Sequence, residues 1–441
     1  MALFLATSCA DVPLAGSLEI ELIIVPGMNP LANATHLRMR IDDGQRHTWP
    51  LGERAEFMPS FDVAADGQLH QLFVEGLDGD GAVTARGESA PVRFDEGVHA
   101  RLRVVPRAVG KFSATVEGLA APRLLFGLAG DASHGLTLIG GLGDVVAAGS
   151  TATTQVEHID PYLGTVRSLP DIPVARRSPV AMRSTSGALI VGLGGVADMH
   201  WLAADAAQWE VASTQVQSVY DAALIGGGVD RWYAVGGFDA VGGPSDQVAQ
   251  FTMTAGGPMA AHIGALLTTR DRPSIAPMGE RFLVAGGSAI LLAEILEVRE
   301  GASIRCQAVS RPPEDPSTVF TITSVSVDDG VLLMGDARTR VLHVSPDGQV
   351  RGAGNLSMAR SGPAATRLDD GRILVSGGEG APNTAELLTL IDGMWTPSEI
   401  IVLTQPRTHH RSVKIAGGNV LLIGGSGAAG LLWLGDIYTP R

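Results

Sequence analysis

Apolar and polar residues alternate along the first hundred residues of the chain. Between residues 17 and 24 apolar side chains occupy every second position, with Glu19 and Glu21 between them. The same alternation returns at residues 37–41 and 98–105, and turn sequences rich in Asp and Gly separate the runs. Six or seven such strands in residues 16–108 predict a small antiparallel β-sandwich. Asp78 and Asp80 lie in one turn without the remaining ligands of a calcium loop, so a plain hairpin turn is predicted there.

From residue 109 onward a different pattern begins, in which short apolar strands end in paired glycines. Seven such endings occur, about 47 residues apart on average. Their first glycines are Gly140, Gly194, Gly236, Gly286, Gly335, Gly377 and Gly424. In the fifth ending Asp336 replaces the second glycine. A period of 40 to 50 residues with strand content is typical of a β-propeller.

A second sequence feature recurs in register with the glycine pairs. In five repeats an arginine precedes the glycine pair by 16 to 18 residues: Arg123, Arg176, Arg270, Arg360 and Arg407. Each repeat is interpreted as a strand, a two-residue hairpin turn, a second strand and the glycine pair. A third strand with an acidic residue follows, as at Glu157, Glu386 and Asp436.

These marks resemble the kelch-repeat family over residues 109–441. The resemblance implies an all-β fold, a kelch-like β-propeller of seven blades, with six as the alternative. The aromatic residues usual in the third and fourth kelch strands remain only at Trp209, Trp395 and Tyr438. Residues 16–108 are similar in architecture to immunoglobulin-like accessory domains, although they lack the Cys and Trp pair of true immunoglobulin domains.

The ends of the repeat region indicate how the ring closes. The seventh repeat stops at Arg441 after three strands, whereas residues 109–118 lie ahead of Arg123 without a blade of their own. We therefore expect residues 109–118 to complete the last blade, with strand pairing over residues 112–117, because an incomplete blade would leave open edges.

Composition narrows the functional classes. Only 18% of residues are charged and 5% are aromatic, and the net charge is −14, which argues against nucleic acid as a partner. The two cysteines, Cys9 and Cys306, exclude a disulfide framework and a cysteine-rich metal site. No apolar run is long enough to span a bilayer. No cofactor is predicted.

The first 15 residues resemble a remnant of a lipoprotein signal followed by a tether. The apolar stretch Met1–Ala6 precedes small residues and Cys9, which would carry the lipid. The basic residue before the apolar stretch is missing, so an ordinary cysteine at position 9 is the alternative. The predicted location is the cell envelope, with membrane contact only through the lipid, and the cytoplasm is the alternative.

Some kelch-like propellers are copper radical oxidases that use tyrosines, histidines and a cysteine. Here Cys306, His409 and His410 and four tyrosines are candidates: Tyr162, Tyr220, Tyr233 and Tyr438. Cys306 falls where a kelch tryptophan would pack, and adjacent histidines on one strand point to opposite faces. A buried apolar role for Cys306 is therefore favoured over copper chemistry.

The loops after the glycine pairs surround one mouth of the channel in a propeller. They carry acidic residues that form the candidate ligand site: Asp144, Asp239, Asp246, Asp336 and Glu379, with Asp198 beside them. Such a ring suits a cation or a basic ligand, and ordinary solvated loop surface is the alternative. The predicted function is a non-catalytic exported protein that binds an unidentified protein or glycan. The alternatives are a carbohydrate-active enzyme and an intracellular kelch-type adaptor.

Overall fold

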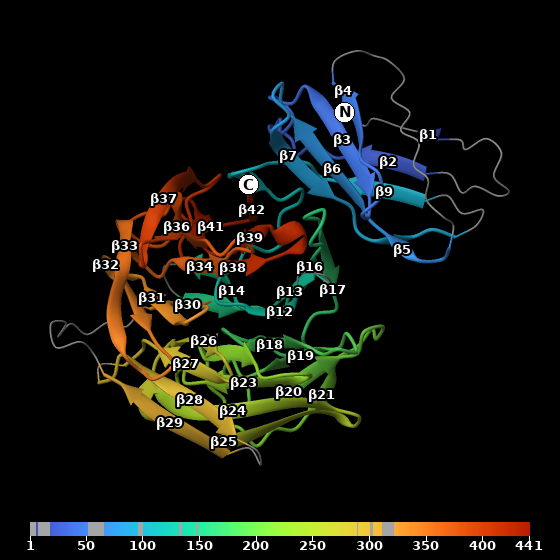
Figure 1. The fold of residues 1–441 in the computed structure, drawn as a ribbon. Coiled ribbons are helices and arrows are strands. Elements are labelled where there is room, and N and C mark those ends of the chain that lie inside the picture. Colours follow the sequence, from blue (N-terminus) through green and yellow to red (C-terminus); the bar gives the residue numbers. More distant parts are fainter. Residues whose placement is uncertain are drawn as a thin grey trace.

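The computed structural model describes residues 6–7, 18–51, 66–95, 100–131, 135–146, 149–288, 290–299, 303–310 and 322–441. Cys9 lies outside these residues. Figure 1 shows a ring of sheets with a smaller unit attached beside it, and the C-terminus on the side of the ring that faces this unit. The described chain contains one short helix, the 3-10 turn Ala416–Gly418, and none of its helices is long and apolar enough to cross a membrane.

The smaller unit consists of two facing sheets and a short ribbon. One sheet has the order β1-β2-β9: Ala6–Thr7, Leu18–Leu22 and Ala100–Val104. The other has the order β10-β7-β6-β3-β4: Arg107–Ala108, Val83–Glu88, Leu72–Leu77, His36–Ile41 and His47–Pro50. The ribbon pairs β5 with β8: Leu69–His70 and Val92–Arg93.

The core of this unit lies between the two sheets. Ile20 and Leu102 from one sheet pack against Met39 and Val74 from the other, and all four are almost fully buried. The expectation of a purely antiparallel arrangement is wrong at one place, because β2 and β9 run parallel. After β2 the chain forms strands of the other sheet, and it then returns to the first sheet as β9, which it enters in the same direction as β2. The predicted hairpin turn is present, because Asp78 Oδ1 accepts hydrogen bonds from the amides of Asp80 and Ala82.

The ring is built from four-stranded antiparallel groups, here called blades and numbered along the chain. Blade 1 contains β12, β13, β16 and β17: Gly127–Asp131, Gly135–Ile139, Val156–Ile159 and Val166–Leu169. Blade 2 contains β18 to β21: Val180–Arg183, Leu189–Gly192, Met199–Leu202 and Glu210–Ala212. Blade 3 contains β22 to β25: Ala223–Gly226, Arg231–Val235, Ser245–Thr254 and Gly257–Arg270. Blade 4 contains β26 to β29: Ser274–Met278, Arg281–Ala285, Ala293–Arg299 and Ser303–Val309.

The same order continues to the end of the chain. Blade 5 contains β30 to β33: Thr323–Val327, Gly330–Met334, Asp336–Val344 and Val350–Ser361. Blade 6 contains β34 to β37: Ala364–Arg367, Ile373–Ser376, Thr384–Ile391 and Met394–Val402. A single parallel bridge between Gly354 and Trp395 joins β33 to β37, so blades 5 and 6 form one continuous sheet. Blade 7 contains β38, β39, β42 and β11: Arg411–Lys414, Val420–Ile423, Asp436–Thr439 and Lys111–Ala114. Two short ribbons project from blades 1 and 7, β14 with β15 and β40 with β41: Leu142–Val146, Gly149–Ala152, Ser426–Gly427 and Gly430–Leu431.

Blade 7 joins the two ends of the ring. The first strand of the ring, β11, pairs with the last strand of the chain, β42, over Lys111–Ala114. The predicted segment, residues 112–117, overlaps this strand. Because β11 and β42 pair with each other, the ring closes without an unpaired strand edge between them.

The arginines of the repeats are buried beside the glycine pairs. Arg270 Nη1 donates to the carbonyl of Gly286 at 2.6 Å, and its Nε donates to Glu294 at 3.0 Å. Arg123 with Glu157, Arg360 with Glu386 and Arg407 with Asp436 repeat this arrangement. All four arginines are fully buried. Arg270 ends β25 of blade 3 and Arg360 lies in β33 of blade 5, so these two arginines connect the outermost strand of one blade to the glycine pair and the third strand of the next.

Blade 2 departs from this arrangement. Arg176 is equally buried and donates to the Leu193 carbonyl at 2.6 Å, but its side-chain partner is Nδ1 of His200 at 2.7 Å. Burial lowers the pKa of Arg176 to about 10, and only Asp198 opposes the shift. Burial and the neighbouring Arg176 both lower the pKa of His200, which therefore stays neutral and accepts this hydrogen bond.

Arg107 connects the smaller unit to the ring. Its side chain is buried and donates to the carbonyls of Tyr162 and Leu163 in blade 1, each at 3.3 Å. Burial lowers its pKa to about 10, whereas Asp160 and Glu88 raise it. Burial also raises the pKa of Glu88 to about 7. The junction thus contains a desolvated guanidinium and a desolvated carboxyl group whose pKa lies near neutral pH.

Candidate functional site

Residues with a left-handed backbone conformation surround one end of the central channel. In six blades the backbone just ahead of the innermost strand has φ between 43° and 58°, at Leu125, Ser178, Asp221, Arg272, Gly362 and His409. This conformation is uncommon for residues other than glycine. In five of these blades the residue lies two positions after the buried arginine, and the counterpart in blade 5 falls outside the described residues. We call the six residues the channel rim.

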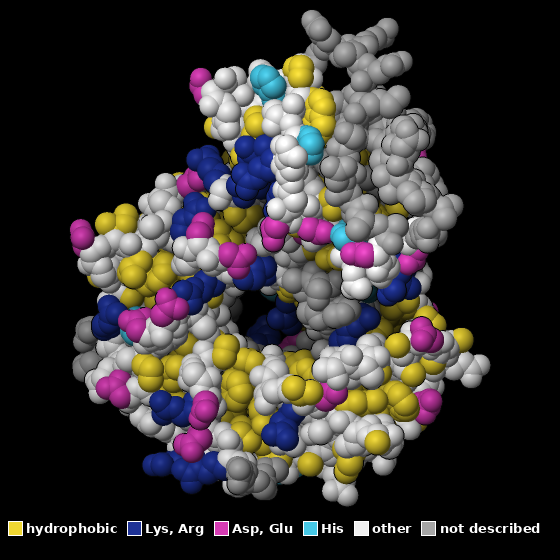
Figure 2. Space-filling view, turned by 45° about the vertical axis from the view of Figure 1, so that its right-hand side comes forward, with side chains coloured by type: hydrophobic (Ala, Val, Ile, Leu, Met, Phe, Trp, Pro, Cys, Tyr) yellow, Lys and Arg dark blue, Asp and Glu magenta, His cyan; other side chains and the backbone are white. Residues whose placement is uncertain are grey.

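The rim opens into a cavity of about 500 Å³ on the axis of the ring. The innermost strands of all seven blades contribute to its wall, from β12 in blade 1 to β38 in blade 7. Figure 2 shows the opening at the centre of the ring, with basic side chains inside it. Cavities of this volume suit small ligands.

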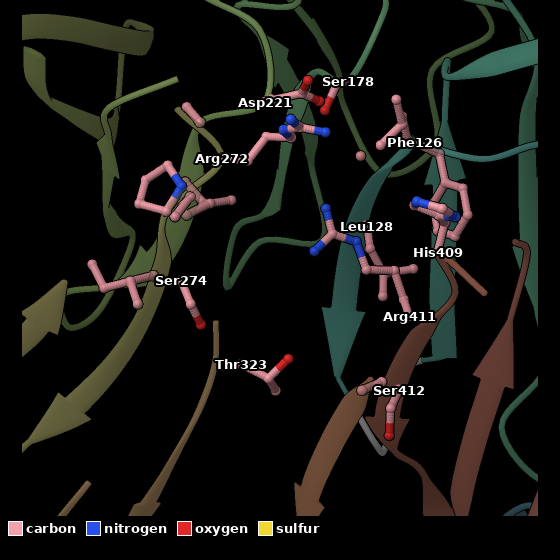
Figure 3. A pocket seen from close by; sticks show the side chains of 18 of the residues that line it. Phe126, Leu128, Ser178, Asp221, Arg272, Ser274, Thr323, His409, Arg411 and Ser412 are labelled. Atoms are coloured by element: carbon pink, nitrogen blue, oxygen red, sulfur yellow. The ribbon is translucent and has the colours of Figure 1, made fainter. Parts of the chain in front are cut away.

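Four ionisable side chains from three blades line this cavity: Asp221 of blade 3, Arg272 of blade 4, and His409 and Arg411 of blade 7 (Figure 3). Arg411 is accessible to water within the channel, although protein surrounds it. The loss of bulk solvation lowers the pKa of Arg411, and the carboxylate of Asp221 opposes that shift. Asp221 itself is mostly buried. The cavity therefore places cationic groups near a single carboxylate.

A stack of rings and guanidinium groups supports the rim between blades 2 and 4. The rings of Tyr220 and Phe238 are stacked with centroids 5.3 Å apart. The guanidinium of Arg177 lies 4.7 Å from the Tyr220 centroid, and that of Arg272 lies 5.6 Å from the Phe238 centroid. Each outer face of the aromatic pair thus carries a cation, a favourable arrangement that holds Arg272 over its ring.

Hydroxyl groups tie neighbouring blades together along the cavity wall. Ser274 and Ser324 share a hydrogen bond of 2.5 Å between blades 4 and 5, and Thr323 donates to the carbonyl of Pro363 at 2.5 Å. Thr366 and Ser412 form a short contact between blades 6 and 7. Because these groups already have partners, the wall is held in place before any ligand arrives.

The two adjacent histidines have different surroundings. His409 is exposed at the rim, whereas His410 is buried and shares a 2.9 Å hydrogen bond with Ser376 Oγ. Burial lowers the pKa of His410 to about 3, helped by Arg407. Both residues precede β38, so the expectation that they lie on a strand is wrong, but their side chains do separate. Cys306 lies in the outermost strand of blade 4 and is half-buried rather than buried, and this partial burial raises its pKa to about 11.

The acidic residues proposed from sequence follow the glycine pairs, outside the rim. Asp239 Oδ1 accepts hydrogen bonds from the amides of Val241 and Gly243 in its own loop. Asp336 is held by Arg340, whose Nε lies 2.8 Å from its carboxylate. Asp246 and Glu379 are exposed.

The side chain of the remaining candidate, Asp144, is not described. Among the four whose side chains are described, no two are in contact, and none lines the cavity of about 500 Å³. In the described part of the chain no three His, Cys, Asp or Glu residues gather closely enough to hold a metal ion. Sequence reasoning missed the rim, although a signal was present in the position two residues after each repeat arginine.

Comparisons with solved structures support this description of the ring. A fungal alcohol oxidase of the AA5 family, solved in complex with copper, matches 75% of this chain and 76% of its own, with a TM-score of 0.55 and 16% identity. A streptogramin B lyase matches 74% of this chain and 96% of its own, with a TM-score of 0.50 and 11% identity. The ring is a β-propeller. At these identities the likeness shows the fold alone.

No family model matches the chain, and no curated protein matches it. The kelch resemblance of the repeats therefore stays a prediction, as does the immunoglobulin-like assignment of the smaller unit.

Proposed function

We propose that the protein is a non-catalytic binding protein whose ligand enters the propeller channel at the rim. The observation that carries the proposal is the cavity of about 500 Å³, to which every blade contributes. The interblade hydroxyl bonds hold its wall in a fixed shape, which lowers the entropic cost of binding. The volume favours a short glycan segment over a folded protein surface.

The exported, lipid-anchored location is part of the same proposal. It rests on the apolar stretch before Cys9 in the sequence. Metabolic labelling with a radioactive fatty acid, in a bacterial host given the gene with its upstream region, tests it. Label in the wild type and its loss in Cys9→Ser would support the anchor, whereas equal label in both would contradict it.

The binding role is tested on an array of immobilised glycans probed with the full chain. His409→Trp enlarges an aromatic side chain that already stands at the rim, and it should block entry to the channel. Val241→Trp is the matched control, because Val241 is 92% exposed and does not line the cavity. Selective glycan binding that only His409→Trp abolishes supports the proposal. Binding to no glycan, or equal binding by both variants, contradicts it.

A carbohydrate-active enzyme is the second candidate. The specific observation in its favour is that a carboxylate and an imidazole, Asp221 and His409, line one cavity, since such groups can transfer protons. Chromatography of each bound glycan after prolonged incubation separates the two functions. An unchanged sugar supports binding alone, and a product that disappears in Asp221→Asn supports the enzyme.

A further inference from the structure

We infer that the channel takes a small polyhydroxylated ligand with a carboxylate group, such as a uronic acid sugar, and that Arg411 and Arg272 receive the carboxylate. This inference rests on the proposed function and names its ligand class. The acidic residues singled out in the sequence predict a basic ligand, whereas the cavity itself favours an anionic one.

The charge of the cavity differs from that of the whole protein. The chain carries a net charge of −14, yet the described cavity wall contains two arginines and one aspartate. Within the described residues the side chain of Arg411 makes no hydrogen bond or ion pair, and the guanidinium of Arg272 has one ion-pair partner, the carboxylate of Asp271 at 3.9 Å. A guanidinium with reduced solvation gains most from a carboxylate, which it can bind through two parallel hydrogen bonds.

The two arginines and one aspartate of the cavity wall leave one positive charge in excess, which favours a ligand with a single negative charge. One carboxylate neutralises it, whereas a doubly charged phosphate would bring a second negative charge close to Asp221. Asp221 can instead accept a hydrogen bond from a ligand hydroxyl, and the hydroxyl of Ser178 lines the same cavity (Figure 3). A sugar with one carboxylate supplies both kinds of group.

Arg272 is held ready for this contact. Its guanidinium rests over Phe238, which is stacked on Tyr220, and this support leaves its donor edges free to turn toward the cavity. Arg411 projects from the start of β38 on the opposite side of the rim from β26, where Arg272 precedes the strand (Figure 3). The two arginines can therefore hold a ligand between them.

Isothermal titration calorimetry of the full chain at low ionic strength tests the inference with four probes: glucuronate, its methyl ester, glucose and cyclohexanecarboxylate. Glucuronate should bind at least about tenfold more tightly than the ester or glucose. Cyclohexanecarboxylate carries the same single carboxylate on a six-membered ring without hydroxyl groups, so weaker binding of this probe than of glucuronate shows that the hydroxyl groups contribute. Arg411→Gln and Arg272→Gln should each weaken glucuronate binding by about tenfold or more.

Arg231→Gln is the matched control, because Arg231 is exposed on β23 and does not line the cavity. Circular dichroism and thermal melting establish that each variant is folded. Equal affinity for glucuronate and glucose, unchanged affinity in Arg411→Gln, or no binding of glucuronate at millimolar concentration overturns the inference. If the array shows a neutral glycan lost in His409→Trp, the proposed function survives while the carboxylate assignment fails.

Discussion

Phe112 and Tyr438 lie directly opposite each other where the first strand of the propeller pairs with the last, and their rings are 5.3 Å apart. Both side chains are buried in the core between blades 6 and 7. The two ends of a ring of more than three hundred residues are thus joined by hydrogen bonds and by an aromatic contact. The shape of the channel depends on this junction.

Phe112→Ala should therefore destabilise the whole propeller. Removal of a buried phenylalanine costs about 3 to 5 kcal/mol, since it leaves a cavity that the strands cannot close. The free energy of unfolding from urea titration measures the effect. Lys111→Ala alters an exposed side chain on the same strand and should change that free energy by less than about 0.5 kcal/mol. Equal losses in the two variants would show that the junction has no special role.

His200→Glu should stabilise blade 2. It supplies the carboxylate that the buried Arg176 lacks and that four other blades provide, and we expect a gain of about 1 to 2 kcal/mol. The reverse change in blade 4, Glu294→His, should cost about 3 kcal/mol or more, because it leaves Arg270 buried without its carboxylate. Urea titrations of both variants give the comparison. A loss of stability in His200→Glu would mean that the histidine is the better partner.

Stability should decline as the pH falls below 6.5. Burial lowers the pKa of His158 to about 4, so between pH 6.5 and 4 the unfolded chain binds a proton at this site that the folded chain does not. The loss is on the order of 3 kcal/mol and is complete once the pH is below the folded pKa. His410, with its pKa lowered to about 3, acts in the same direction.

Thermal melts of wild type and His158→Gln between pH 7.5 and 4 measure this effect. The variant should show a shallower decline, because one of the groups that cause it is gone. Identical slopes would contradict the assignment. Glu88, whose pKa is raised to about 7, acts with the opposite sign, since its contribution is lost as the pH rises above 4.5.

Phe238→Ala should weaken glucuronate binding by about two- to fivefold, less than Arg272→Gln, because it removes a cation–π contact worth about 0.5 to 1 kcal/mol and leaves the guanidinium in place. The titration used for the arginine variants measures it. Leu390→Ala, an exposed change on blade 6, should leave the affinity unchanged. An equal effect of Phe238→Ala and Leu390→Ala would show that the stack does not position Arg272.

The propeller could be predicted because the residues that specify each blade lie close together in the sequence and recur at a regular spacing. Each glycine pair reflects a close backbone approach, as at Gly236, where an added Cβ would lie 2.9 Å from the carbonyl oxygen of Arg270. Each repeat arginine lies 16 to 18 residues before such a pair, so the period is visible in the sequence. The parallel pairing of β2 with β9 could not be foreseen, because alternation alone does not set strand direction.

The position two residues after each repeat arginine marks most of the rim in the sequence, but its role depends on backbone conformation. Asp221 and Arg272 have a positive φ, which their residue types alone do not predict. The acidic residues chosen instead do follow the glycine pairs, as expected. Whether Asp239 or Asp336 has a free carboxylate depends on contacts inside its own loop or strand, which composition does not reveal.

A crystal structure of the full chain soaked with glucuronate shows directly whether the channel binds a uronic acid. We expect density for the sugar inside the channel rim, with its carboxylate within hydrogen-bonding distance of the Arg411 guanidinium and a hydroxyl facing Asp221. Density only on the outer strands of the blades or on the smaller unit, with none of the sugar in the channel, would contradict it.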